Sequence, residues 1–389
     1  MMEKGSDAII ERFRHITENA HEYAKSLSRG KGRSLAGYMC THVPEEILYA
    51  AGITPVRVLS SHVSQALTRS YIHETYCSFS HDCAYQGLQH NYDYLDLIVT
   101  SSSCIHMGEA FNVWVRFAGF QGKSFLLPFP HIMQTKPAAG FLVDSFGEFK
   151  QFIQKFVKKS ITDDDIEGAI KTYNRNRKFL KRLWEFLRHD NPPITGSEAA
   201  TVTLASQLMD KEECNQMLEQ LIRGLEAAPG KAPPGVRLMV TGGACDDMKI
   251  FDLIEHLNYS ASLIFIDSCT AARYFWFEVP EDRPDKLEAL AEGYLGRIPC
   301  PAKDNVPGTG ERKRFRFFQQ SIEDFKPDGI VFIYQRFCSP QPNDVVALKP
   351  ILDKLGIPWT ELELDTTIPI TQFGTQLEAL VEIINRVAP

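Results

Sequence analysis

The sequence has no apolar run long enough to cross a lipid bilayer. Spanning the hydrocarbon core takes about 18–20 consecutive apolar residues, and no such run occurs among the 389 residues. Residues 1–27 alternate charged and apolar side chains at helical spacing and contain no apolar signal-peptide core. We therefore expect a cytoplasmic protein that does not associate with membranes.

A surplus of positive charge is also missing. The chain has 42 Lys and Arg against 49 Asp and Glu, which gives a formal net charge of -7 at pH 7. Because nucleic-acid binding requires a cationic surface, the charge argues against a nucleic-acid partner. The chain contains no GxxxxGK[ST] loop either, so it is not itself a P-loop ATPase.

The nine cysteines contain no CxxC pair. Zinc fingers, zinc ribbons and compact ferredoxins need closely spaced pairs, so the spacing argues against all three. Disulfides are not expected in a reducing cytoplasm. The cysteines are therefore either buried thiols or ligands brought together from distant parts of the chain.

Predicted strands alternate with predicted helices in two separate parts of the chain. This alternation is typical of parallel βαβ units. Residues 1–30 form one amphipathic helix in this interpretation, and long charged helices are expected over 148–158, 163–188 and 196–225. The predicted strands cover residues 34–40, 54–59, 94–100, 124–128, 236–241, 262–267, 329–334 and 359–364.

The predicted fold class is therefore α/β, with two doubly wound parallel-sheet domains of Rossmann or flavodoxin type. We expect an N-terminal helix (1–33), a first α/β domain (34–143), a helical connector (144–230) and a second α/β domain (231–389). A proline- and glycine-rich segment at 228–235 marks the boundary before the second domain. A cofactor is expected in the cleft between the two domains.

Five cysteines follow directly after predicted strands. Open parallel sheets bind ligands beyond the carboxyl ends of their strands. The pattern fits an iron–sulfur cluster between the domains, but buried structural thiols, a zinc site and a catalytic cysteine remain alternatives. The five residues are Cys40, Cys104, Cys245, Cys269 and Cys338.

An ordered set of short motifs resembles the benzoyl-CoA reductase / 2-hydroxyacyl-CoA dehydratase subunit family, including its double-cubane cluster branch. The resemblance covers nearly the whole chain. Two positions depart from the family pattern, because Ile105 follows Cys104 where an aspartate is usual, and Gln376 stands where an arginine is usual. The motifs lie at residues 37–56, 92–96, 174–177, 192–198, 267–275, 290–295, 328–331, 337–340 and 356–358.

The resemblance implies a [4Fe–4S] cluster held by Cys40, Cys104 and Cys338. Three further cysteines match positions of the double-cubane branch, so an [8Fe–9S] cluster is the alternative. The remaining thiols are interpreted as buried. The double-cubane positions are Cys77, Cys269 and Cys300, and the thiols interpreted as buried are Cys83, Cys214 and Cys245.

The implied activity is one-electron transfer to an acyl-CoA thioester, as an iron–sulfur subunit of a reductase or dehydratase. The implied partners are an ATP-hydrolysing iron–sulfur activator and a homologous subunit or a second copy of this chain. The alternatives are a homodimeric double-cubane reductase of small molecules and a non-catalytic iron–sulfur subunit of a heterodimer.

Candidate acid–base and substrate-binding residues flank the predicted ligands. Glu46, His42 and His106 are the catalytic candidates, and Arg273 and Tyr274 could bind a phosphate or carboxylate of the substrate. Each also has a structural interpretation. A carboxylate at a helix start favours the helix dipole, and a histidine or arginine in a loop can simply hold the fold together.

Overall fold

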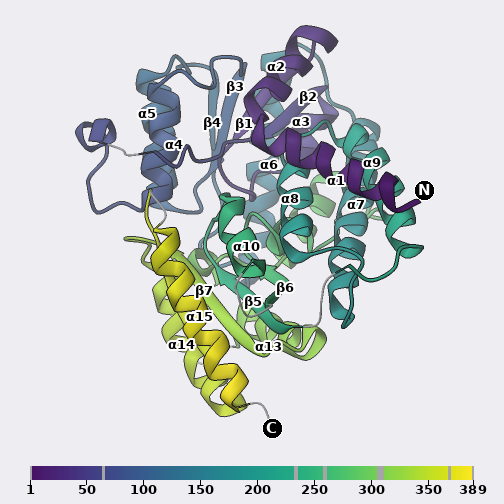
Figure 1. The fold of residues 1–389 in the computed structure, drawn as a ribbon. Coiled ribbons are helices and arrows are strands. Elements are labelled where there is room, and N and C mark those ends of the chain that lie inside the picture. The colour runs from purple at the N-terminus through teal and green to yellow at the C-terminus, as the bar shows by residue number, and fades with distance from the viewer. Residues whose placement is uncertain are drawn as a thin grey trace.

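The computed structural model describes residues 2–63, 66–231, 235–256, 261–304, 311–366 and 369–387. Within these residues the strands form two four-stranded sheets whose strands are all parallel, which confirms the predicted fold class (Figure 1). The first has the order β2 (Ile53–Arg57), β1 (Ser34–Tyr38), β3 (Leu97–Ser101), β4 (Ser124–Leu127). The second has the order β6 (Ala261–Asp267), β5 (Val236–Gly242), β7 (Gly329–Gln335), β8 (Trp359–Leu364). Both follow the doubly wound order 2-1-3-4.

The helices of the first half include one that the sequence did not predict. This helix, α5, begins directly after Cys104, and its buried residues Met107, Ala110, Phe111 and Trp114 recur at helical spacing. It packs against α4. The elements are α3 (Glu45–Ala50), η1 (Ala66–Ser70), α4 (Ser78–Leu88), α5 (Ile105–Phe117) and α6 (Lys136–Val157).

The N-terminal segment forms two helices rather than the single predicted one. α1 (Met2–Glu18) ends before Asn19, whose φ of -117° and ψ of 40° are not helical, and α2 (Ala20–Lys31) follows. The prediction overlooked this break because the apolar spacing continues across it. α1 packs against α8 and α9, far along the chain (Figure 1).

The middle of the chain is helical, as predicted. Thr162 and Asp165 form a capping box at the start of one helix, and Thr195 and Glu198 form another. The single helix predicted over 196–225 is instead two, because Asp210 caps a new helix with its side chain. The elements are α7 (Asp163–Glu185), η2 (Phe186–Arg188), α8 (Gly196–Ser206) and α9 (Lys211–Glu226).

The second half continues the βα pattern. α12 packs against α6 of the first half, and an isolated bridge joins Ile132 to Asp304. The predicted linker over 228–235 includes residues outside the described ones. The elements are α10 (Met248–Glu255), α11 (Ala272–Phe275), α12 (Lys286–Gly296), η3 (Pro301–Lys303), α13 (Lys313–Phe325), α14 (Pro340–Leu355) and α15 (Ile370–Val387).

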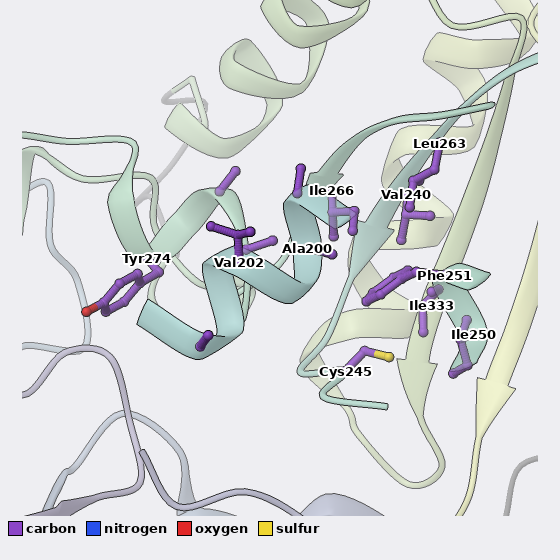
Figure 2. Close-up of a cluster of buried hydrophobic side chains, with 14 of the residues drawn as sticks. Ala200, Val202, Val240, Cys245, Ile250, Phe251, Leu263, Ile266, Tyr274 and Ile333 are labelled. Carbon is purple, nitrogen blue, oxygen red and sulfur yellow. The ribbon is translucent and has the colours of Figure 1, made fainter. Parts of the chain in front are cut away.

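The larger of two buried apolar clusters extends from α1 and β2 to all four strands of the second sheet. Figure 2 shows part of it, where Val240, Ile266 and Ile333 of three neighbouring strands lie on the side of α8 and α10. The other cluster joins β1 and β3 to α6 and α12. No helix in the described ranges is both long enough and apolar enough to cross a membrane.

Candidate metal centre

The six predicted metal ligands all precede a helix. Cys77 and Cys104 are the N-cap residues of α4 and α5, and Cys300 is the N-cap residue of η3. The other three lie in the loops from β1 to α3, from β6 to α11 and from β7 to α14. Backbone N–H groups at a helix start favour the thiolate form of cysteine. The three cysteines in loops are Cys40 (β1 to α3), Cys269 (β6 to α11) and Cys338 (β7 to α14).

The six thiols are close enough to influence one another electrostatically. Burial raises the pKa of Cys104 to about 11, and the neighbouring Cys77 and Cys40 contribute to the rise. Burial also raises the pKa of Cys338, again with Cys77 and Cys104 among the causes. Burial raises the pKa of Cys300 to about 12, opposed by Arg273 and reinforced by Cys269 and Cys40. These influences therefore link the six predicted ligands, but they also link Cys83 to Cys77 and Cys245 to Cys269.

This set does not have the geometry of a mononuclear site. In the described ranges, no three His, Cys, Asp or Glu side chains are grouped to hold a single metal ion. Tetrahedral ligands at the zinc–sulfur bond length of about 2.3 Å would place their sulfurs about 3.8 Å apart. In a cubane each thiolate binds a different iron, so the sulfurs lie farther apart.

Arg57 lies at the end of β2 among these thiols. It is only 2% exposed, yet its Nε and Nη1 have no hydrogen-bond partner in the structure. Its Nη2 lies 3.9 Å from Cys269 Sγ. Burial alone would lower the pKa of Arg57, but Cys269, Tyr38 and Cys40 raise it overall.

Two further buried cations, Arg297 and Lys303, lie in the same region as Arg57. Arg297 donates to the carbonyl oxygen and Oγ1 of Thr41, while its Nε has no partner. Lys303 Nζ donates to Ser102 O at 3.0 Å. Burial lowers the pKa of Lys303, and Cys40, Cys300 and Cys104 oppose this lowering.

No carboxylate of the described residues lies within 4.0 Å of the charged nitrogens of these two or of Arg57. Uncompensated buried charges are costly, and an anionic cluster with its thiolates would compensate them. The residues present therefore fit an iron–sulfur cluster.

His42 and His106 lie beside the predicted ligands. His42 is buried, its Nδ1 is 3.4 Å from Cys40 Sγ and its Nε2 has no partner. Burial and the positive charges of Arg297 and Lys303 hold the pKa of His42 well below its usual value, so the ring is neutral. His106 Nδ1 accepts a hydrogen bond from the backbone N–H of Cys77 at 3.1 Å.

Glu46 is surrounded by protein groups. Its Oε1 accepts from Arg177 Nη2 at 2.5 Å, and its Oε2 accepts from Tyr294 Oη at 2.8 Å. The carboxylate has no exposed surface. Both of its oxygens are therefore engaged in joining α3 to α7 and α12.

Arg273 and Tyr274 also bind protein groups. Arg273 Nε donates to Asp267 at 2.7 Å, and its Nη2 donates to the carbonyl oxygens of Gly242 and Asp267. Tyr274 Oη accepts from Lys211 Nζ at 2.8 Å. Both residues are buried. The structure thus places them in the interior behind the thiol set, where Arg273 influences Cys300 by its charge.

The three cysteines interpreted as buried are indeed buried. Cys245 belongs to the larger apolar cluster, and Figure 2 shows its side chain directed to the side where Ile250 and Ile333 lie. Cys214 lies on α9, where Asn176 Nδ2 is 3.5 Å from its sulfur. Cys83 is in the middle of α4.

Sequence reasoning did not single out Arg57, Arg297 or Lys303. Arg57 could have been noticed in the sequence, because it is a charged residue at the end of the otherwise uncharged strand Ile53–Arg57. Arg297 and Lys303 flank Cys300 at three residues on either side, which is a weaker signal. Their burial depends on contacts with the loops after β1 and β3, which the sequence alone does not indicate.

The fold and the site together define a two-sheet α/β protein with several partly buried thiols in the loops beyond the carboxyl ends of its strands. A family model described as 2-hydroxyglutaryl-CoA dehydratase, D-component, matches residues 40–384. The chain belongs to this family, which confirms the resemblance found in the sequence.

Relatives of known function match the chain over most of their length. The beta subunit of (R)-phenyllactyl-CoA dehydratase from Clostridium sporogenes is 26% identical, over 97% of this chain and 99% of the relative. The beta subunit of (R)-2-hydroxyglutaryl-CoA dehydratase from Acidaminococcus fermentans is also 26% identical, over 96% and 98%. One of the subunits of benzoyl-CoA reductase from Thauera aromatica is 21% identical, over 79% of both chains.

Proposed function

We propose that this chain is an iron–sulfur subunit of a 2-hydroxyacyl-CoA dehydratase, or of a related acyl-CoA reductase. The observation that carries the proposal is the group of three buried cations near the predicted thiol ligands, which lack carboxylate partners among the described residues. Similarity to dehydratase beta subunits along nearly the whole chain supports the substrate class.

Cys40, Cys104 and Cys338 are the proposed ligands of a [4Fe–4S] cluster. When bound, the cluster would supply one-electron reduction of a thioester carbonyl at the low potentials open to such centres. His42 would hold Cys40 by donating its Nδ1 proton to the thiolate, since their atoms lie 3.4 Å apart. His106 would hold the loop of Cys77 through the backbone hydrogen bond.

Partner proteins are part of the proposal. The two dehydratase relatives are named as beta subunits, which supports a homologous subunit or a second copy of this chain as a partner. The chain has no P-loop motif. We therefore assign ATP hydrolysis to a separate iron–sulfur activator, which would deliver the electron.

The six-thiol set also favours a second candidate, a homodimeric double-cubane reductase of small molecules. Cys77, Cys269 and Cys300 are linked electrostatically to the three proposed ligands. A non-catalytic iron–sulfur subunit is the third candidate, and it requires no exchangeable ligand on iron.

Metal analysis of protein prepared without oxygen tests the proposal. A single cubane gives about four iron and four sulfide per chain, and a double cubane about eight iron and nine sulfide. Co-purification with a homologous subunit separates a heterodimer from a homodimer. Colourless, iron-free preparations obtained under strictly anaerobic conditions would refute all three candidates.

Cysteine variants test the ligand assignment. Cys40→Ala, Cys104→Ala and Cys338→Ala should each lose most of the bound iron, because a thiolate ligand is removed. Cys214→Ala is the matched control, since Cys214 is buried on α9 and is not among the thiols linked to the set. Iron retained in all three variants would contradict the assignment.

A further inference from the structure

Arg57, Arg297 and Lys303 come from three separate places in the fold and converge on the proposed ligands. Arg57 ends β2, Arg297 follows α12 and Lys303 ends η3. Each side chain is at most 2% exposed. Their neighbours include Cys269 for Arg57, Cys40 for Arg297 and Lys303, and Cys300 and Cys104 for Lys303.

The three other buried arginines of the described residues are compensated by carboxylates, whereas buried Lys211, like Lys303, has no carboxylate of those residues within 4.0 Å. Arg177 pairs with Glu46 at 2.5 Å. Arg273 pairs with Asp267 at 2.7 Å, and Arg314 pairs with Asp267 at 2.9 Å and also with Asp344. Each of these arginines has at least one carboxylate, whereas the described residues offer none within 4.0 Å of the three cations at the thiols.

The two arginines at the thiols also have donors without a hydrogen-bond partner. Arg57 has two N–H-bearing nitrogens and Arg297 has one that are buried without a partner. A buried donor without an acceptor destabilises the protein, and more so when the group is charged. Sulfides and thiolates of a cluster accept hydrogen bonds, and such bonds together with net charge set its reduction potential.

We propose that Arg57, Arg297 and Lys303 are positioning residues that hold the anionic cluster in place and shift its reduction potential to a less negative value. The inference rests on the proposed function, because it assumes that a cluster binds here. A fixed positive charge stabilises the reduced state more than the oxidised state, since the reduced state carries one more negative charge. It also opposes loss of the cluster.

The test removes one charge at a time from the full-length holoprotein. Lys303→Met and Arg57→Met are compared with Lys159→Met, in which an exposed lysine just after α6 is lost. The readouts are the midpoint potential, from a dithionite titration followed by electron paramagnetic resonance, and the rate at which an iron chelator removes the metal. We expect more negative potentials and severalfold faster iron loss in the two buried variants, with Lys159→Met unchanged.

Charge-conserving variants separate electrostatics from packing. Lys303→Arg and Arg57→Lys should return the potential towards the wild-type value, which a purely structural role would not predict. Thermal unfolding shows whether Lys303→Met and Arg57→Met are folded. If either is not, Arg57→Gln replaces it in the test, because glutamine keeps hydrogen-bonding groups and still removes the charge. Wild-type potential and iron retention in every folded variant that lacks a charge would overturn the inference.

The two levels of the proposal fail in different ways. If the wild-type protein contains no iron, the proposed function fails. If the wild-type protein contains a cluster and its potential does not respond to the three charges, the proposed function stands and only the inference about the cations fails.

Discussion

At the scale of single residues, the buried ion pair between Glu46 and Arg177 is expected to contribute strongly to the stability of the fold. Glu46 is fully buried and Arg177 is 5% exposed, and Tyr294 occupies the second carboxylate oxygen. We predict that Glu46→Gln destabilises the fold by about 3–5 kcal/mol, because it leaves a buried guanidinium without its counter-charge. Urea unfolding measures this loss.

An exposed ion pair provides the control for this prediction. Glu11 and Arg14 on α1 form a pair at 2.9 Å whose side chains are 66% and 41% exposed. Glu11→Gln should change stability by less than about 1 kcal/mol, as is usual for surface pairs. Equal effects of Glu11→Gln and Glu46→Gln would contradict the importance of the buried pair.

The sequence predicted the loops that carry the proposed ligands better than it predicted what surrounds them. Strand ends are visible in the sequence, so Cys40, Cys104 and Cys338 could be placed at one edge of each sheet. The environment of Glu46 could not be predicted, because its partners lie on α7 and α12, more than a hundred residues away. Arg297 could not be predicted for the same reason, since its contact with Thr41 spans most of the chain.

At the scale of elements, α4 and α5 carry two proposed ligands at their starts and pack closely against each other. A Cβ atom added at Gly87 of α4 would overlap the indole ring of Trp114 on α5. Trp114 Nε1 donates to Cys83 O at 2.7 Å, so the ring cannot move without losing this bond.

We predict that Gly87→Ala destabilises the protein by about 1–3 kcal/mol, the usual cost of overpacking a core. Gly140→Ala in α6 is the control, because an added Cβ there meets nothing within 4 Å. It should stabilise by about 0.5–1 kcal/mol, since alanine favours a helix interior over glycine. Chemical denaturation measures both changes, and a stabilising Gly87→Ala would show that the two helices can separate freely.

At the scale of the whole molecule, one loop of the first sheet is linked to one loop of the second. Ser60 and His62 follow β2, and Asp246 follows β5. Ser60 N–H donates to Asp246 Oδ2 at 2.6 Å, and His62 Nε2 lies 3.3 Å from Asp246 Oδ1. His62 N–H also donates to Asp82 Oδ2 at 3.0 Å. The two contacts with Asp246 join the two halves of the chain.

The charge of His62 makes this link depend on pH. Burial would lower the pKa of His62, but the hydrogen bond to Asp246 and the charges of Asp246, Asp247 and Asp82 raise it to about 9. Because the folded pKa exceeds the unfolded value of about 6.5, the folded state binds more protons between these values. The stabilisation is therefore complete below about pH 6.5 and is lost as the pH rises through about 9.

We predict that the free energy of unfolding falls between pH 6.5 and 9, and that Asp246→Asn removes most of this dependence. Comparing the variant with the wild type is essential, because the raised pKa values of Cys104 and Cys300 also affect the pH dependence of the metal-free protein. Those contributions are common to both proteins and cancel in the difference. Asp246→Asn should therefore cost most stability at pH 6 and progressively less towards pH 9. Urea unfolding of both proteins at a series of pH values measures this difference. A difference that does not change with pH would mean that His62 is uncharged in the folded protein.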